Sequence, residues 1–267
     1  MSNIAEYFIT RFVTAVCVLF GVSISSGNAQ KLRIAAASDL QWAMPELIAE
    51  FRKQSSNTSN NAQIEAVYGS SGNFVAQIRA GAPFDIFFSA NIEYAEQLTN
   101  AGLTTTKPRE YAQGIVVLWC SARSSFIQSP KDLTNPRVQR ISLANPRHAP
   151  YGKRAEEFLH RFFADTLVLK RVWGNVVFAD NVAQAAQFVQ MGAANCGFIS
   201  LSLALAPPVQ SSGGRIIRLD STLAPPLRQA AVVMKARKEA ALAHSFLDFV
   251  CSPKAATIFT RYGFLKP

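Results

Sequence analysis

A strand that passes directly into a helix through a serine or glycine occurs twice in the first third of the chain. The apolar segment 32–37 leads into Ser38, after which a helical pattern begins. The segment 64–68 leads into the sequence GSSG at 69–72, which contains Ser71 and again precedes a helical pattern. A helix N-terminus offers free backbone N–H groups and a partial positive charge, and a serine adds a hydroxyl. Both junctions therefore predict anion-binding positions without a charged side chain, and we expect them to face one cleft.

Strand-like and helix-like segments alternate along nearly the whole chain after the N-terminal region. Short apolar runs predict strands, and apolar residues spaced by three or four predict amphipathic helices. The alternation predicts an α/β fold with a parallel sheet and helices on both faces. The polar run 55–61 predicts a surface loop. The expected strands are 32–37, 64–68, 85–88, 115–120, 141–144, 176–179, 196–201 and 231–234, and the expected helices are 40–51, 74–78, 92–101, 156–163, 182–191, 240–250 and 254–262.

The N-terminal segment has the pattern of an export signal. Arg11 is followed by the uncharged, mostly apolar run 12–24, and small residues up to Ala29 come next. A basic start, an apolar stretch and a small-residue cleavage site predict a signal peptide over residues 1–29. An uncleaved membrane anchor is the alternative, although the run is short for a bilayer span. We therefore expect an exported, soluble mature protein.

Composition sets the size of the fold and limits its partners. The chain has 267 residues, of which 49% are apolar, so it can form one large or two medium domains. The formal net charge of +10 suits a protein that attracts anions. The basic residues are dispersed and form no stripe interleaved with aromatic residues, which argues against a nucleic-acid partner.

The cysteines and histidines indicate neither a metal site nor a dense disulfide framework. Cys120 and Cys196 lie in apolar strand-like segments, where we expect small buried side chains, with a disulfide framework as the alternative. Together with Cys251 they make an odd number, so at least one thiol stays unpaired. The chain shows no CxxC or Cys/His spacing typical of a metal site, and its three histidines are scattered.

Six motifs occur in order through the mature sequence. They are AAASDL at 35–40, GSSG at 69–72, GAPFDIFFSAN at 81–91, ANPRHAPYG at 144–152, DNVAQA at 180–185 and CGFIS at 196–200. Together they resemble the periplasmic molybdate-binding proteins of molybdate ABC transporters, which belong to the type II solute-binding proteins. The resemblance implies a two-lobed α/β fold in which each lobe is a mostly parallel sheet flanked by helices. It also implies a first lobe over 30–112 plus 226–267 and a second lobe over 113–225.

The resemblance further implies which residues hold the ligand. Ser38 and Ser71 match positions that give a hydroxyl and an amide, and Tyr151 and Val182 match positions that give backbone amides. Ser200 stands where the family usually has a tyrosine hydroxyl, so this contact is expected to be lost, to pass through water or to be made differently. Molybdenum would be present only within the bound oxyanion, and no cofactor is implied. The implied partners are an ABC permease and its ATPase, the implied location is the periplasm, and a monomer is expected.

The residues themselves are consistent with such a site. Ser38, Ser71, the turn 150–152 and Val182 each stand where a strand or loop gives way to a helix. Ligands of open α/β sheets bind outside the carboxyl ends of the strands, where helix N-termini converge. A site built from donors favours a fully deprotonated tetrahedral oxyanion, because a protonated anion also needs an acceptor. Ordinary helix capping by the two serines is the alternative, and Asp39 is expected to stabilise a first helical turn rather than to contact the ligand.

Other functions remain as alternatives. Tungstate is nearly isosteric with molybdate and is expected to bind, and another oxyanion such as sulfate, or a small organic acid, is the main competing ligand. A secreted serine hydrolase using Ser70 or Ser71 is remote, because the chain has no GxSxG, HExxH or recognisable carboxylate pair. A ligand-sensing domain of a transcription regulator would need a DNA-binding helix pair, whereas this N-terminus resembles an export signal. The sequence therefore predicts a binding protein, not an enzyme, that closes its lobes on an oxyanion.

Overall fold

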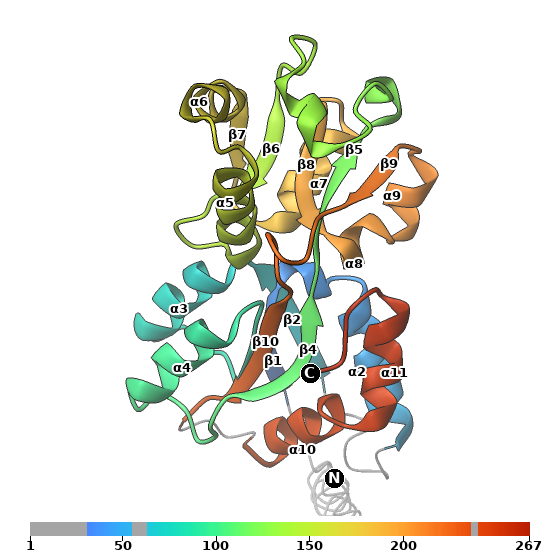
Figure 1. The fold of residues 1–267 in the computed structure, drawn as a ribbon. Helices are drawn as coiled ribbons and strands as arrows, with labels where there is room; N and C mark the ends of the chain where they lie inside the picture. The colour runs from blue at the N-terminus through green and yellow to red at the C-terminus, as the bar shows by residue number, and fades with distance from the viewer. Residues whose placement is uncertain (1–30, 55–62, 236–239) are drawn as a thin grey trace, which may run out of the picture.

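The computed structural model describes residues 31–54, 63–235 and 240–267, which form two α/β lobes stacked end to end (Figure 1). One sheet has the strand order β2-β1-β3-β10-β4, and the other has the order β7-β6-β8-β5-β9. The expected signal peptide at 1–29 and the expected loop at 55–61 lie outside the described residues. No helix within the described part of the chain is long and apolar enough to cross a membrane.

The first lobe surrounds the sheet that contains β1. Strand β1 runs parallel to β2 and β3, whereas β10 runs antiparallel to β3 and β4. Side chains alternate between the two faces, so Ile34 packs in the core beside α2, α10 and α11, while Ala35 packs beside α3 and α4. Figure 1 shows α3 and α4 on one side of this sheet and α2 and α11 on the other. The elements are β1 (Lys31–Ala37), η1 (Ser38–Leu40), α2 (Ala43–Gln54), β2 (Gln63–Gly69), α3 (Ser71–Arg79), β3 (Ile86–Ser89), α4 (Ile92–Asn100), β4 (Arg109–Gly114), β10 (Leu227–Val233), α10 (Ala240–Val250) and α11 (Pro253–Arg261).

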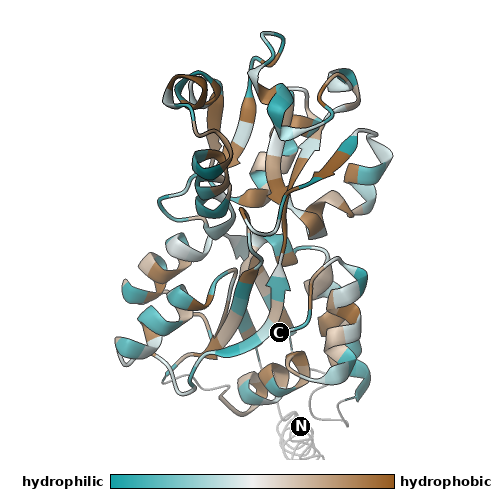
Figure 2. Ribbon diagram, in the orientation of Figure 1, coloured by the Kyte–Doolittle hydropathy of each residue, from teal (hydrophilic) through white to brown (hydrophobic). Residues whose placement is uncertain are grey.

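The second lobe surrounds the other sheet. Strand β6 runs parallel to β7 and β8, and β5 runs antiparallel to β8 and β9. Figure 2 shows apolar residues concentrated in these strands and hydrophilic residues along α5. The elements are β5 (Val116–Cys120), η2 (Ala122–Ser124), η3 (Pro130–Thr134), β6 (Ile141–Ala144), α5 (Pro150–Phe162), α6 (Thr166–Gly174), β7 (Val176–Ala179), α7 (Val182–Gln190), β8 (Cys196–Ser200), α8 (Leu201–Ala204), α9 (Pro207–Ser211) and β9 (Arg215–Arg218).

The two-lobed α/β class is confirmed, and each expected strand and helix has a counterpart in the structure. Both sheets are mixed, since half of the strand pairings in each are antiparallel. Strands β4 and β9 contribute antiparallel edges that the sequence does not predict, because REYAQG and RIIR carry too many polar residues to read as buried strands. Helix α5 begins at Pro150 rather than at residue 156, because proline suits the first turn of a helix.

Two crossing segments join the lobes. One passes from β4, which ends at Gly114, to β5, which begins at Val116. The other passes from β9 to β10 over residues 219–226. Gly114 leaves space for the second lobe, because a Cβ there would lie 2.0 Å from the Tyr151 hydroxyl. The lobe boundaries at 30–112 plus 226–267 and at 113–225 stay a prediction.

Candidate functional site

A small cavity lies where the ends of strands in the first lobe face the starts of helices in the second. Its volume is about 10 Å³, which is room for about one water molecule. The lobes are therefore closed over it. The lining residues come from both lobes: Ala37, Ser38, Asp39, Gly69, Ser70, Ser71, Ala90, Ala149, Pro150, Tyr151 and Val182.

The structure brings four of the five expected ligand-binding residues together in this lining. Ser38, Ser71, Tyr151 and Val182 are all buried there. Ser200 is not in the lining. Its hydroxyl accepts a hydrogen bond from the amide of residue 203 at 3.2 Å and so caps the short helix α8. Whether these residues contact a ligand stays a prediction.

Helices α3 and α5 bring first-turn amides to the cavity without a side-chain cap. The hydroxyl of Ser70 precedes α3 but makes no capping bond. The Ser71 hydroxyl accepts a hydrogen bond from the amide of Ala90 at 3.0 Å. Helix α5 follows Ala149, which has no capping side chain, and its first residue is a proline, so Tyr151 carries the first N–H of the helix. These helix starts combine directed donors with a partial positive charge.

Helix α7 adds a third helix start from the second lobe. Its cap residue Asn181 accepts hydrogen bonds from the amides of Ala183 and Gln184, both at 3.0 Å. The Asn181 side chain accepts no hydrogen bond from the amide of Val182, the first residue of the helix. The amide of Ala183 also donates to the Ser38 hydroxyl at 3.4 Å, which is a contact between the lobes.

His148 makes two further contacts between the lobes. Its Nδ1 lies 2.8 Å from the Ser70 hydroxyl, and its carbonyl accepts a hydrogen bond from the amide of Gly72 at 2.9 Å. A Cβ at Gly72 would lie 2.8 Å from both the Cα and the carbonyl oxygen of His148. Only glycine therefore allows this approach of the two backbones. Because the partners belong to different lobes, these contacts exist only when the lobes are closed.

Asp39 connects the lobes through its carboxylate. Its Oδ2 accepts hydrogen bonds from the Tyr151 hydroxyl at 2.7 Å and from Gln229 Nε2 at 2.6 Å. The Tyr111 hydroxyl donates to Gln229 Oε1 at 2.8 Å, and the Ser202 hydroxyl donates to the backbone carbonyl of Asp39 at 2.9 Å. Asp39 lies in the first turn of η1, as expected, but its side chain also lines the cavity and holds the second lobe.

Burial controls the protonation of this network. Asp39 is 0% exposed, and desolvation raises its pKa from 3.8 to about 6, although hydrogen bonds from Gln229 and Tyr151 partly oppose the shift. Burial also raises the pKa of Tyr111 and of Tyr151 well above the usual value, so both phenols stay neutral donors. The second carboxylate oxygen, Oδ1, has no hydrogen-bond partner among the described residues. The cavity therefore holds one acidic group beside its donors.

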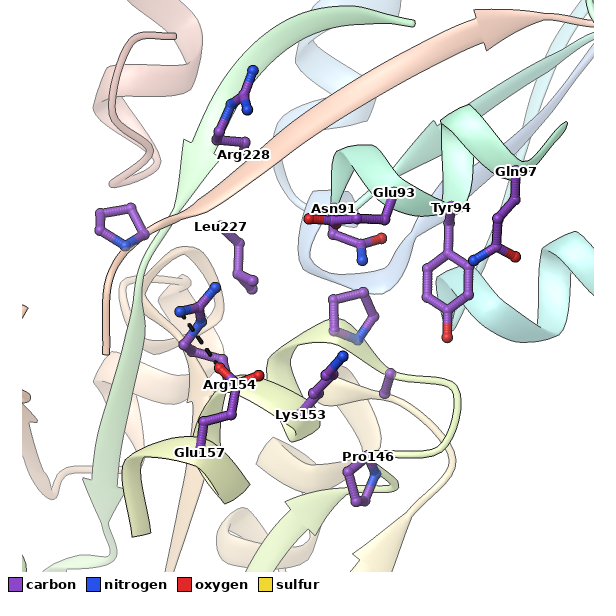
Figure 3. Close-up of a pocket in the computed structure, with 13 residues that line it drawn as sticks. Asn91, Glu93, Tyr94, Gln97, Pro146, Lys153, Arg154, Glu157, Leu227 and Arg228 are labelled. Atoms are coloured by element: carbon purple, nitrogen blue, oxygen red, sulfur yellow. Dashed lines mark ion pairs between the residues drawn. The ribbon is translucent and has the colours of Figure 1, made fainter. Parts of the chain in front are cut away.

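A wider groove of about 290 Å³ adjoins the cavity and shares two lining residues with it at the start of α5 (Figure 3). Lys153 and Arg154 line it from α5, and Arg228 lines it from β10. Arg154 lies 3.5 Å from Glu157, and Arg228 forms an ion pair with Glu110. The described residues hold no group of three or more histidine, cysteine or acidic side chains suited to a metal ion. The lining of the groove thus mixes three cations with the carboxylates of Glu93 and Glu157.

The residues that close the site are the part that the sequence does not predict. Ser202 and His148 contact the first lobe from the second, and Gln229 Nε2 donates across the lobes to the Tyr151 hydroxyl at 3.0 Å. Tyr111 holds Gln229 from within the first lobe. Gln229 interrupts the apolar run of β10, and a buried side-chain amide needs hydrogen-bond partners. This polar residue is the sequence feature that indicates a buried hydrogen-bond network at this position. His148 lies inside the motif ANPRHAPYG, whose resemblance points to Tyr151 only.

Two α/β lobes that meet at a donor-lined cavity are the arrangement found in solute-binding proteins, a class whose lobes close on a ligand by hinge motion. The chain belongs to the bacterial extracellular solute-binding protein family, which matches residues 32–265. The molybdate-binding protein ModA of Azotobacter vinelandii is 28% identical and aligns over 97% of this chain and 98% of its own. The ModA of Rhodobacter capsulatus is 29% identical over 94% of each chain. The solved structure of the Azotobacter vinelandii periplasmic molybdate-binding protein gives a TM-score of 0.78 and 29% identity, and the match covers 88% of this chain and 99% of that chain. The resemblance to the molybdate-binding proteins is thereby confirmed.

Proposed function

We propose that this chain is an exported binding protein that captures molybdate between its lobes and delivers it to an ABC permease driven by a cytoplasmic ATPase. The cavity carries the proposal: the hydroxyls of Ser38 and Ser71 meet the helix starts at Tyr151 and Val182 there. The relatives that bear the name molybdate-binding protein suggest the identity of the ligand. Their alignments extend over nearly the whole of this chain.

The proposed contacts are hydrogen bonds from hydroxyls and backbone amides to the four oxygens of the anion. Ser38 and Ser71 each offer a hydroxyl and an amide, and Tyr151 and Val182 each offer an amide. A hydrogen bond to a charged group contributes about 1.5–3 kcal/mol, and helix dipoles add to it. We leave Ser200 out of the contact set, because its hydroxyl already caps α8.

Ligand capture requires the lobes to separate first. The cavity has about 10 Å³ of open space, which is too little for a four-oxygen anion. Opening breaks the contact between Ser38 and Ala183 and both contacts of His148. Rotation about the crossing segments at residues 114–115 and 219–226 permits this motion. On closure, oxygens of the anion replace the Ser38 hydroxyl as acceptors at the start of α7.

The remaining parts of the proposal follow from the same function. Tungstate has the size and charge of molybdate and binds at the same site. The mature protein works in the periplasm as a monomer after its signal peptide is removed. It carries no cofactor and performs no reaction on the anion.

Asp39 favours one second candidate, a protonated oxyanion such as hydrogen phosphate. Its Oδ1 has no partner in the described residues, and an ionised carboxylate accepts a hydrogen bond from the O–H of such an anion. Molybdate has no proton to offer at neutral pH. Asp39 must therefore be neutral or turned away when molybdate is bound.

Calorimetric titration with molybdate, tungstate, sulfate and phosphate tests the proposal. Molybdate and tungstate are expected to release heat and to stabilise the protein by about 2.7 kcal/mol at about 100 times the dissociation constant. The exposed Ser125, changed to alanine, serves as a control for serine replacement outside the cavity. Absence of both heat and thermal shift with molybdate at concentrations far above micromolar would refute the assignment. Preferential binding of phosphate would favour the second candidate.

A further inference from the structure

Two cysteines are direct cross-strand neighbours in the second sheet. Cys120 is the last residue of β5, Cys196 is the first residue of β8, and the two are direct partners in the antiparallel register. The amide of Ser121 donates to the carbonyl of Asn195 at 3.0 Å, just outside the pair. This hydrogen bond places the cysteines at a non-hydrogen-bonded position of the ladder.

The opposite end of the same ladder supports this placement. Val116 pairs with Ser200, and the amide of Leu201 donates to the carbonyl of Ile115 at 2.8 Å. Pairs two residues apart share one type, so the pair at residues 120 and 196 is of the non-hydrogen-bonded type as well. In such pairs the Cα atoms are about 4.5 Å apart and the side chains lie on the same face. A disulfide needs Cα atoms about 4.4–6.8 Å apart, so this backbone already suits one.

We propose that Cys120 and Cys196 form a disulfide in the exported protein. The proposal rests on export as part of the proposed function, because disulfides form in oxidising compartments. The two thiols lose two protons and two electrons, and the S–S bond forms between their sulfur atoms. The oxidant is a disulfide of a thiol oxidoreductase or of glutathione, which is reduced to two thiols. One thiolate first attacks that disulfide, which releases one thiol of the oxidant and leaves a mixed disulfide. The second thiolate then attacks the protein sulfur of the mixed disulfide, which forms the Cys120–Cys196 bond and releases the other thiol of the oxidant.

Oxidation occurs before the second lobe is fully packed. Both cysteines are 0% exposed in the folded chain, so no oxidant reaches them. A hydrogen bond with Cys120 and burial raise the pKa of Cys196, so the folded state holds little of the reactive thiolate at this position. In the unfolded chain the thiols are accessible and have ordinary pKa values. The same burial protects the finished bond from reductants.

Cys251 is left as the free thiol. It follows α10 in the first lobe, is partly exposed, and contacts the backbone carbonyl of Glu110 at 4.0 Å. Neither Cys120 nor Cys196 lies in that lobe. Of the three cysteines of the mature chain, Cys120 and Cys196 therefore form the buried pair and Cys251 stays unpaired.

Thiol counting tests the pairing. The mature chain is unfolded with reductant, refolded in a mixture of oxidised and reduced glutathione, and then alkylated in denaturant without reductant. We expect one alkylated thiol by intact mass, three after prior reduction, and a linked peptide that joins Cys120 to Cys196. The variant Cys251→Ser is expected to show none before reduction, and Cys120→Ala is expected to show no linked peptide between these strands.

Three alkylated thiols in the refolded protein, or a bond that includes Cys251, would overturn the proposal. The count needs no ligand and no export, so it does not depend on whether molybdate binds. If the bond forms and molybdate fails to bind, only the proposed function is refuted. If molybdate binds and three thiols remain, only the disulfide is refuted.

Discussion

Replacement of Asp39 by asparagine removes one buried charge and leaves its network nearly intact. The amide oxygen of asparagine can accept from the Tyr151 hydroxyl and from Gln229 Nε2, as Oδ2 of Asp39 does. The amide nitrogen takes the place of Oδ1, which has no partner among the described residues. We therefore expect Asp39→Asn to be more stable than the parent protein at neutral pH, with a gain that depends on pH.

The size of the gain follows from the shift in the pKa of Asp39. Burial raises this pKa from 3.8 to about 6, and each unit corresponds to about 1.36 kcal/mol, or about 3 kcal/mol in total. The folded state holds the proton more tightly than the unfolded state does. The stability that this provides is fully present below pH 3.8 and is lost as the pH rises to about 6. The advantage of the asparagine variant should thus grow from near zero below this window to about 3 kcal/mol above it.

Equilibrium unfolding in urea at a series of pH values measures this difference. The parent protein, Asp39→Asn and the control Asp180→Asn, which changes an exposed carboxylate, are compared. Only Asp39→Asn is expected to flatten the pH profile. Parallel profiles for Asp39→Asn and the parent protein, or destabilisation by the variant at every pH, would refute the reasoning.

The other predictions concern the cavity and its closure. Ser38→Ala and Ser71→Ala should each weaken molybdate binding by about 1.5–3 kcal/mol in calorimetry, and unchanged affinity in both would show that the cavity is not the binding site. Tyr151→Phe removes a hydrogen-bond donor to the buried Asp39 carboxylate. The free energy of unfolding should therefore fall by about 1–3 kcal/mol at pH 7. An unchanged free energy of unfolding would contradict the hydrogen-bond network around Asp39. Gly72→Ala places a Cβ against the opposite lobe. This variant should lower molybdate affinity at least about tenfold, which corresponds to about 1.4 kcal/mol. Wild-type affinity would show that this close approach of the lobes is not needed.

The sequence predicts buried strands better than edge strands. Segments such as 141–144 and 196–200 are almost wholly apolar because both faces of the sheet carry helices, and this composition identifies them. Strands β4 (109–114) and β9 (215–218) lie at sheet edges, so solvent-facing residues interrupt their apolar pattern. Their positions become clear only when the partner strand is known.

The lining of the cavity is predicted from local pattern, whereas its closure is not. Ser38, Ser71 and Val182 stand at junctions between a strand or loop and a helix, and each junction is visible within about ten residues of sequence. The partners of Asp39 come from 112 and 190 residues away. No local pattern connects such positions, so the sequence predicts a backbone role for Tyr151, which stays a prediction, but not the contact of its hydroxyl with Asp39.

The carboxylate of Asp39 links ligand choice to pH. A bound dianion favours the neutral form of a neighbouring carboxyl, because two adjacent like charges repel each other. If Asp39 keeps its place when molybdate binds, it must hold a proton, so affinity should fall as the pH rises above about 6, the pKa of Asp39 in the ligand-free protein. An anion that brings its own proton instead needs the ionised carboxylate as an acceptor, so ionisation of Asp39 strengthens its binding. Ionisation of Asp39 thus weakens the binding of molybdate and strengthens the binding of a protonated anion. Asp39→Asn removes this pH-dependent contribution to binding for both ligands.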